Sequence, residues 1–396
     1  MNQYRDYHLL FLSYALSLFG TGIAVVGLAL LAFDLVGDYA GAVLGTALAI
    51  KTAAYIVVAP VAAVIAGRVS KRDLMIGLNL VRAAAILALP WVTSVWQLYL
   101  LIFAFAAASA VFIPTYQAIV PHLLTSPDAY HRALTKARVA TELENAASPL
   151  AAAALLLLFN HDGLFLTAVA ILLLSGLCLT SARIPEMRTI AGAEIWRELR
   201  RGARLFTESP DVRFLIPLNL AVALATAMVL VNTVVLVRGL FDLGERETAI
   251  ALAAFGVGVL LGAVLMLPVL RRVGTRQTML AGAVLTVLGL LAGTQIASFP
   301  GLLAIWAALG LGSGLALTPA SIVLRQHFQT EDRVLLYATY FAMSNAALLL
   351  AYPLAGWVGA TLGLKAGFIL LALIAGLAVL VALRLGRNAS EARRET

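Results

Sequence analysis

Charged residues are scarce in this chain of 396 residues, and their scarcity excludes a water-soluble protein. Asp, Glu, Lys and Arg make up 12% of the sequence, whereas 62% of it is hydrophobic. Soluble domains contain about 25% charged and about 45 to 50% apolar residues. A helix that crosses a bilayer uses about 20 residues, so the apolar content suffices for about twelve such helices. We therefore expect an all-α integral membrane protein.

Cysteine and cofactor-binding patterns are nearly absent as well. The single cysteine, Cys178, lies in an apolar segment, which excludes an internal disulfide and a cysteine-based metal cluster. The five histidines show no spacing typical of metal ligands. No phosphate-binding loop is present, which argues against ATP as the energy source. We expect no metal, no cofactor and no enzymatic activity.

The net charge of +8 does not indicate nucleic-acid binding. Lys and Arg lie in short turns between apolar segments, without the interleaved aromatic residues on which bases stack. If the N-terminus is cytoplasmic, most of these charges fall on the inner side, and the outer loops hold only Arg238, Arg246 and Lys365. Because cytoplasmic loops carry the excess of positive charge, we expect both termini to be cytoplasmic and the lipid bilayer to be the main surroundings.

The same landmarks occur twice along the chain. Pro114 and Pro149 are matched by Pro319 and Pro353 at an almost constant offset, and such repeats are typical of transporters. We predict membrane spans at residues 9–35, 40–66, 74–94, 96–120, 138–159, 163–182, 213–238, 247–270, 277–297, 300–325, 333–362 and 366–384. The predicted domains are a six-helix bundle at 1–182, a cytoplasmic amphipathic linker at 183–212, and a second six-helix bundle with a short cytoplasmic tail at 213–396.

The linker carries a basic amphipathic pattern. Ile195, Leu199 and Phe206 recur at helical spacing beside Arg200 and Arg204. This pattern predicts a helix that lies on the inner membrane surface near anionic headgroups.

Pairs of glycines four residues apart occur in two spans of the second half. Gly258 and Gly262 form one pair, and Gly310 and Gly314 form the other. Small residues at this spacing let helix backbones approach closely, so we expect both spans to be closely packed.

Two segments carry a resemblance to a known family. Residues 60–75, PVAAVIAGRVSKRDLM, resemble the turn signature that follows the second span in the major facilitator superfamily. The sequence FIP at 112–114, followed by Pro121 and by SP at 148–149, resembles that superfamily's third branch of drug and proton antiporters. The branch includes macrolide, siderophore and nickel exporters. The resemblance implies the major facilitator fold, with twelve transmembrane helices in two six-helix halves, and transport by alternating access.

The resemblance also implies a gate at the cytoplasmic turn, formed by Arg68, Lys71, Arg72 and Asp73. The chain departs from the family pattern at Gly67, where an acid that helps to lock the two halves is usual, so Asp73 is the candidate to replace it. It departs again at Thr21, where members of the branch often carry an acid.

Ionisable side chains at membrane depth are costly and mark candidate functional sites. Lys51 lies about ten residues into span 2, or about 15 Å along its axis, which is too deep for easy snorkelling. Either it pairs with Asp34 between spans 1 and 2, or it contacts the substrate or a gate. Arg82, in span 3, either binds an anionic substrate through its fork of donors or bonds neighbouring groups and stabilises the bundle.

Glu142 and Glu144, near the inner start of span 5, are the candidates for proton coupling. Residues two apart on a helix point to nearly opposite faces, so at most one of them faces the pore. Glu142 lies four residues after Arg138, and an ordinary intrahelical ion pair is its alternative role. A buried carboxylate that binds and releases a proton is what a proton-coupled exporter needs.

Other polar and aromatic side chains are candidates for lining the substrate cavity, which in the superfamily is formed largely by spans 1, 4, 7 and 10. Hydrogen bonding between helices is the alternative role for the polar ones among them. These candidates are Tyr14, Ser17, Thr21, Asn219, Thr226, Asn232 and Trp306.

These features predict a secondary transporter in the bacterial cytoplasmic (inner) membrane. We expect a multi-pass monomer that exports a small organic molecule, such as a drug, secondary metabolite or siderophore, in exchange for protons. The direction of transport rests on the resemblance alone. Two alternatives stay open, namely an exporter of nickel or another metal cation, and a transporter-like membrane sensor that moves no substrate.

Overall fold

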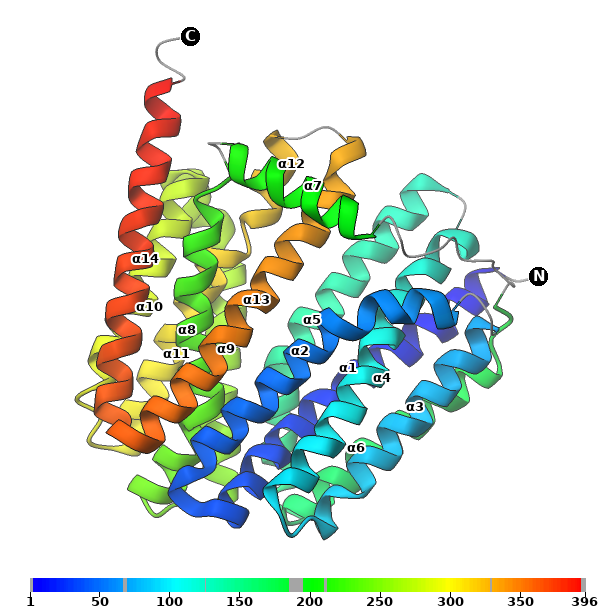
Figure 1. Ribbon diagram of the computed structural model, residues 1–396, viewed down its shortest axis with the longest axis horizontal. Helices are drawn as coiled ribbons and strands as arrows, with labels where there is room; N and C mark the ends of the chain where they lie inside the picture. The colour runs from blue at the N-terminus through cyan, green and yellow to red at the C-terminus, as the bar shows by residue number, and fades with distance from the viewer. Residues whose placement is uncertain are drawn as a thin grey trace. The chain divides into compact units, whose positions relative to one another are not determined.

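Helices make up nearly all of the chain that the computed structural model describes, which comprises residues 3–66, 70–124, 126–184, 195–209, 212–327 and 330–392 (Figure 1). The first half holds α1 (Gln3–Val36), α2 (Ala40–Ala66), α3 (Lys71–Leu87), α4 (Val95–Leu123), α5 (Pro127–Leu155) and α6 (His161–Thr180). After α7 (Ile195–Glu208), the second half holds α8 (Leu215–Val234), α9 (Glu245–Val273), α10 (Thr275–Gly293), α11 (Phe299–Leu317), α12 (Ala320–His327), α13 (Thr330–Leu362) and α14 (Leu364–Ala392).

These helices confirm the predicted fold class. Each predicted span overlaps a helix, although the ends differ for several of them, and span 10 is divided between α11 and α12 at residues 318–319. Ten stretches of the described chain are long and apolar enough to cross a membrane, and the longest, Tyr4–Val58, contains α1 and most of α2. The helix α5 is not among them, because charged residues are frequent in its N-terminal part.

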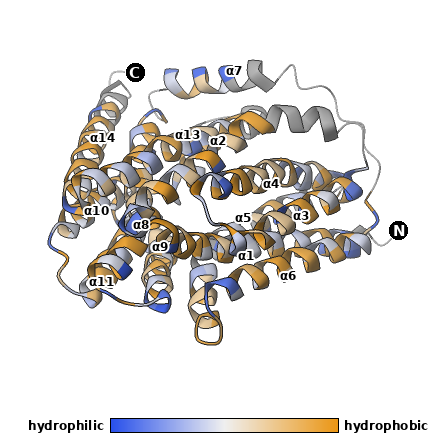
Figure 2. Ribbon diagram, turned by 60° about the horizontal axis from the view of Figure 1, so that its bottom comes forward, coloured by the Kyte–Doolittle hydropathy of each residue, from blue (hydrophilic) through white to orange (hydrophobic). Residues whose placement is uncertain are grey.

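Hydrophobic residues predominate along the helices, and hydrophilic ones gather mainly near helix ends and in connections (Figure 2). Many large apolar side chains are exposed on the helix surfaces, among them Val264, Leu350 and Leu373. Exposed apolar surface of this extent is unfavourable in water and suits contact with lipid chains. The helices therefore have the surface of a multi-pass membrane protein.

The chain forms two compact units. The first comprises Met1–Val36 and Ile50–Gly192, and the second comprises Gly37–Ala49 and Ala193–Thr396. Within the first unit, α1 packs against α5 and α6, and α3 packs against α4 and α6. Within the second, α11 packs against α9 and α10, and α8 packs against α13 and α14. The start of α2 therefore groups with the second unit although it precedes that unit in the chain, and the predicted domain boundaries stay a prediction.

The glycine pairs of the second unit lie where α9 and α11 approach each other. A Cβ atom at Gly314 would lie 2.5 Å from the carbonyl oxygen of Val259, and one at Gly262 would lie 2.5 Å from that of Leu311. Any side chain at these positions would push the two backbones apart. The predicted close packing of both spans is confirmed.

The linker helix α7 packs against α13 of the same unit. Phe206 is fully buried, and its ring stacks on Tyr340 with the ring centroids 6.2 Å apart. A Cβ atom at Gly202 would lie 3.2 Å from Cδ1 of Leu335. The described apolar side of this helix is covered by α13, because Gly202 and Phe206 form a face that fits that helix. The predicted position of the linker helix on the inner membrane surface stays a prediction.

Candidate functional site

A buried arginine lies at the centre of a polar cluster in the first unit. The guanidinium of Arg82, on α3, donates hydrogen bonds to Oγ1 of Thr21 at 2.6 Å, to Oδ1 of Asn79 at 3.2 Å and to the carbonyl oxygen of Ser17 at 3.3 Å. It also donates to the hydroxyl oxygen of Ser17. Only 3% of Arg82 is exposed. The predicted candidates Ser17 and Thr21 of α1 thus bind Arg82 directly.

The cluster continues into α6 through residues that sequence reasoning missed. Nδ2 of Asn79 donates to Oγ of Ser175 at 2.9 Å, and that hydroxyl donates to the carbonyl oxygen of Ser13 at 2.7 Å. Ser13, Asn79 and Ser175 are all buried. The signal that could have identified Asn79 is its position three residues before Arg82 in an apolar helix, since residues at this spacing are neighbours.

The charge of Arg82 has no carboxylate partner within the described part of the chain. Two aromatic rings of α4 flank the guanidinium, and its Cζ lies 5.1 Å from the ring centroid of Phe105 and 5.2 Å from that of Phe112. Such cation–π contacts stabilise a desolvated cation. One donor stays unused, because the buried Nε atom has no hydrogen-bond acceptor among the residues described. Neutral acceptors and rings therefore compensate a full positive charge.

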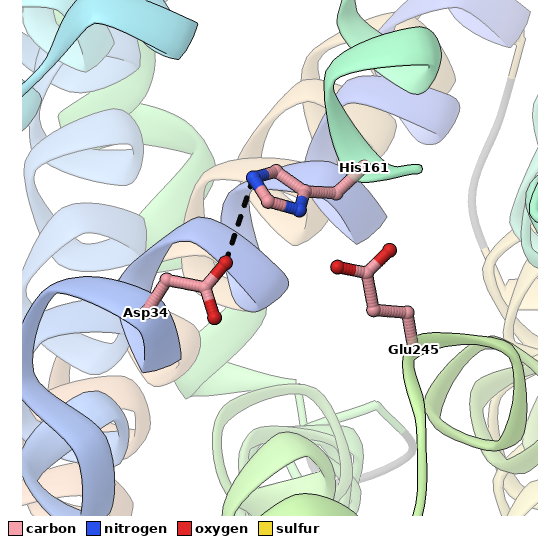
Figure 3. A group of neighbouring side chains, drawn as sticks. All are labelled: Asp34, His161 and Glu245. Carbon is pink, nitrogen blue, oxygen red and sulfur yellow. Dashed lines mark ion pairs between the residues drawn. The ribbon is translucent and has the colours of Figure 1, made fainter. Parts of the chain in front are cut away.

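Lys51 and Asp34 do not pair with each other. Nε2 of His161, at the start of α6, lies 3.5 Å from Oδ2 of Asp34 at the end of α1 (Figure 3). Figure 3 also draws Glu245, which lies at the start of α9 and belongs to the second unit. Lys51 is half-buried and forms no hydrogen bond or ion pair with the described residues. The interpretation of Lys51 and Asp34 as an ion pair is wrong, because helix packing brings Asp34 to α6 instead.

Glu144 lies at the contact between α5 and α1. A Cβ atom at Gly22 would lie 2.6 Å from a carboxylate oxygen of Glu144, so this carboxylate sits directly on the backbone of α1. The glutamate is half-buried. The adjacent Ser148 is buried, and its hydroxyl has no partner among the described residues. The side chains of Glu142 and Arg138 lie outside the described part, so the predicted pair of these two stays a prediction.

Tyr14 joins α1 to two neighbouring helices. Its hydroxyl lies 3.3 Å from Oγ1 of Thr141 on α5, and its ring stacks on Tyr116 of α4 with the centroids 4.0 Å apart. Tyr14 is 5% exposed. Tyr14 therefore forms a contact between helices in this conformation.

The polar candidates of the second unit are also engaged between helices. Nδ2 of Asn219 donates to Oγ of Ser344 at 2.5 Å, and Nδ2 of Asn232 donates to the carbonyl oxygen of Ala355 at 3.1 Å. These bonds tie α8 to α13. Nε1 of Trp306, which is fully buried on α11, donates to Oγ1 of Thr233 at 2.8 Å. The remaining candidate, Thr226, is half-buried and forms no hydrogen bond within the described chain.

Comparison with known families decides the classification. The sequence profile described as Major Facilitator Superfamily matches residues 10–245 and 217–396, which together span nearly the whole chain. This protein belongs to the Major Facilitator Superfamily. It is therefore a multi-pass membrane protein of a transporter family, as the resemblance implied.

Solved structures of superfamily transporters share its fold at low sequence identity. A bacterial homologue of the human lysosomal transporter Spinster, in an inward-facing and unoccupied conformation, is 14% identical with a TM-score of 0.77, and 98% of each chain is covered. The nucleoside transporter NupG is 15% identical with a TM-score of 0.67, and 97% of this chain and 98% of that chain are covered. A POT family transporter in complex with a thioalcohol-conjugated peptide is 15% identical with a TM-score of 0.74, over 97% of this chain and 96% of that chain. A comparison with curated proteins found no match.

The turn between α2 and α3, which the superfamily resemblance marked as a gate, is described in part. Arg68 and Gly67 lie outside the described residues. A guanidinium nitrogen of Arg72 donates to the carbonyl oxygen of Thr180 at 2.5 Å and ties α3 to α6. Asp73 is exposed at the start of α3, where its backbone N–H donates to Oγ of Ser70 at 3.1 Å and its carboxylate accepts from that hydroxyl at 2.7 Å. The described contacts of Asp73 are those of a helix cap. Lys71 is buried.

Proposed function

We propose that this superfamily member is a secondary transporter that exports a small organic molecule across the bacterial cytoplasmic membrane in exchange for protons. In this proposal the chain acts as a monomer without enzymatic activity and without a cofactor, and both termini are cytoplasmic. Its working parts are two six-helix domains at 1–182 and 213–396, joined by the cytoplasmic linker. The likeness of residues 112–114, 121 and 148–149 to the third branch of drug and proton antiporters supports the direction of transport.

The observation that carries the coupling part of the proposal is the position of Glu144. Its carboxylate lies against Gly22, and the preceding residue of α1, Thr21, accepts a hydrogen bond from Arg82. Since α1 contacts both the carboxylate and the buried cation, a movement of this helix on substrate binding would change the surroundings of Glu144. This arrangement supports the proposal of proton release on substrate binding.

The experiment is a measurement of proton release from the purified protein at low buffer capacity when candidate compounds are added. The native protein and Glu144→Gln are compared, with Glu208→Gln as the matched control. Glu208 is exposed on α7, outside the membrane spans, and pairs with Arg204 at 2.8 Å. We expect release from the native protein and from the control variant, and none from Glu144→Gln.

Each contrary outcome points to a different conclusion. Release that persists in Glu144→Gln would contradict coupling through this carboxylate and direct attention to Glu142. Compounds that bind without proton release, and that produce no flux in proteoliposomes, would favour the membrane sensor. Proton release on addition of Ni²⁺ alone would favour the metal exporter.

A further inference from the structure

Arginines gather at one end of three neighbouring helices in the second unit. Arg271 and Arg272 are exposed at the end of α9, and Arg384 is exposed on the C-terminal part of α14. Arg276, at the start of α10, is half-buried and donates a hydrogen bond to the carbonyl oxygen of Leu383 on α14 at 3.3 Å. Because α10 directly follows α9 and packs against α14, these four arginines lie at the same end of the three helices, which we call the arginine end.

The positive charge of the arginine end is not balanced within these helices. The last two turns of α9, the whole of α10 and residues 364–385 of α14 contain no Asp or Glu. The opposite ends differ, because Glu245 and Glu247 accompany Arg246 at the start of α9 and Lys365 at the start of α14. An excess of positive charge is therefore found at only one end of α9, α10 and α14.

The surface of α14 next to Arg384 has the length of a bilayer core. Its exposed large apolar side chains recur every three or four residues and so lie on one face of the helix. Exposed cations end this stripe on both sides, Lys365 at the start and Arg384 at the finish. From Lys365 to Arg384 the helix rises about 29 Å at 1.5 Å per residue, and the hydrocarbon core of a bilayer is about 30 Å thick. Arg384 therefore lies at the level of lipid headgroups. The apolar stripe consists of Ile369, Leu373, Leu377 and Leu380.

The apolar surface continues on the two neighbouring helices. Val264 and Leu267 are exposed on α9 in the two turns before Arg271, and Val284 and Leu288 are exposed on α10. Acyl chains can lie along such a surface. Guanidinium groups bind phosphate oxygens through two parallel hydrogen bonds. Cations that directly border an apolar surface of this length suit a phospholipid better than a free phosphate, which has no chains to bury.

We propose that the arginine end binds an anionic phospholipid, with the headgroup at Arg272 and Arg384 and the acyl chains along the exposed surface of α9, α10 and α14. A net negative headgroup is preferred to a zwitterionic one, because these helix ends offer no carboxylate to an ammonium group. Arg276 is a positioning residue, since its bond to Leu383 holds the adjacent Arg384 close to α10. This proposal does not depend on the cargo or on proton coupling.

The test is native mass spectrometry of the full-length protein in detergent with two defined lipids. Dioleoylphosphatidylglycerol is the anionic probe, and dioleoylphosphatidylcholine, which has the same acyl chains, is the zwitterionic one. One basic residue near an anionic headgroup strengthens binding by about fivefold. We expect the native protein to bind phosphatidylglycerol at least about fivefold more tightly than phosphatidylcholine.

A double variant connects this preference to the arginine end. Arg272→Gln with Arg384→Gln removes two exposed charges, and we expect it to bind the two lipids with nearly equal affinity. The matched control is Arg246→Gln with Lys365→Gln, which removes two exposed charges from the same two helices at their opposite ends. We expect the control to keep the native preference.

A second pair of substitutions separates charge from geometry and from folding. Arg272→Lys with Arg384→Lys keeps both charges and loses the forked donors. We expect this variant to bind phosphatidylglycerol more weakly than the native protein does, and still to prefer it to phosphatidylcholine. The midpoint of thermal unfolding, measured for each variant, identifies any loss of binding that comes from a loss of fold.

Four results would overturn the lipid site. They are equal affinity of the native protein for both lipids, native preference in the double glutamine variant, loss of preference in the control to the same extent, and binding of glycerol 1-phosphate as tight as that of the lipid. The last result would indicate a site for free phosphate. Since no cargo is added in these measurements, their failure leaves the proposed transport function untouched, and absence of transport would leave the lipid site.

Discussion

Replacing Phe206 by alanine should release the linker helix α7 from α13. Phe206 is fully buried, and its ring stacks on Tyr340 with the centroids 6.2 Å apart. The opposite side of α7 is solvent-exposed and includes Arg200, Arg201 and Arg204. The Glu208 carboxylate bonds Arg204 at 2.8 Å and raises the pKa of its guanidinium, but an exposed pair of this kind adds little to stability. The contact of Phe206 is therefore the main attachment among the described side chains of α7.

The size of the effect follows from the buried ring. Truncation of a buried phenylalanine to alanine costs about 3 kcal/mol or more, and loss of an aromatic pair adds about 0.5 to 1.5 kcal/mol. A loss of about 3 kcal/mol increases the population of the open linker about a hundredfold, since 1.4 kcal/mol corresponds to a factor of ten. Cleavage by a protease follows this population when opening is fast relative to cleavage.

The assay is limited trypsin digestion in detergent, with cleavage after Arg204 followed by mass spectrometry. Thr207→Ala is the control, because Thr207 is exposed and its hydroxyl bonds only carbonyl oxygens of its own helix, at 3.0 and 3.1 Å. We expect cleavage after Arg204 to accelerate about a hundredfold in Phe206→Ala and to stay near the native rate in the control. Equal rates in the native protein and in Phe206→Ala would refute the attachment of α7 to α13 through this ring.

Four further substitutions test two glycine positions, one hydrogen bond between helices and one helix cap. Gly314→Ala should lower the midpoint of thermal unfolding in detergent, because its Cβ would lie 2.5 Å from the Val259 carbonyl oxygen. Gly77→Ala should raise this midpoint, because a Cβ at Gly77 meets no atom within 4 Å and alanine is more favourable than glycine in a helix by about 1 kcal/mol. Trp306→Phe loses the 2.8 Å bond to Thr233 and should cost about 1 kcal/mol in denaturant unfolding, and an unchanged midpoint would show that this bond adds nothing. Ser70→Ala removes the N-cap of α3, which should cost about 1 kcal/mol and so increase the rate of amide hydrogen exchange in the first turn of α3 by a factor of about five. Exchange at the native rate would contradict the role of Ser70 as a cap.

The start of α5 could not be predicted from hydropathy. The apolar pattern predicts a span at 138–159, whereas α5 begins at Pro127. The bilayer selects apolar residues only over its own thickness, and beyond it the helix continues with charged residues such as Arg132 and Lys136. The sequence feature that marks the start of α5 is Ser126, which is followed by a proline at the first helical position.

The hydrogen-bond partners of Arg82 could not be predicted from the local sequence pattern. The depth of Arg82 in an apolar span identifies it as exceptional, but its acceptors on α1 are separated from it by 61 and 65 positions. Which helix supplies them depends on how α1, α3 and α6 are rotated about their axes. Ser13 and Ser175 look ordinary in the sequence because serine is tolerated in any apolar helix.

The sequence by itself determined the class of this protein, the positions of its membrane helices and the close packing of Gly258 and Gly262. These properties depend on runs and spacings within one helix, and the thickness of the bilayer sets the length of each run. Only the tertiary structure decided that Asp34 pairs with His161 and not with Lys51, and that Arg82 keeps a buried donor without an acceptor in the described chain. Partners of this kind come from different helices, and their meeting depends on packing that no single segment specifies.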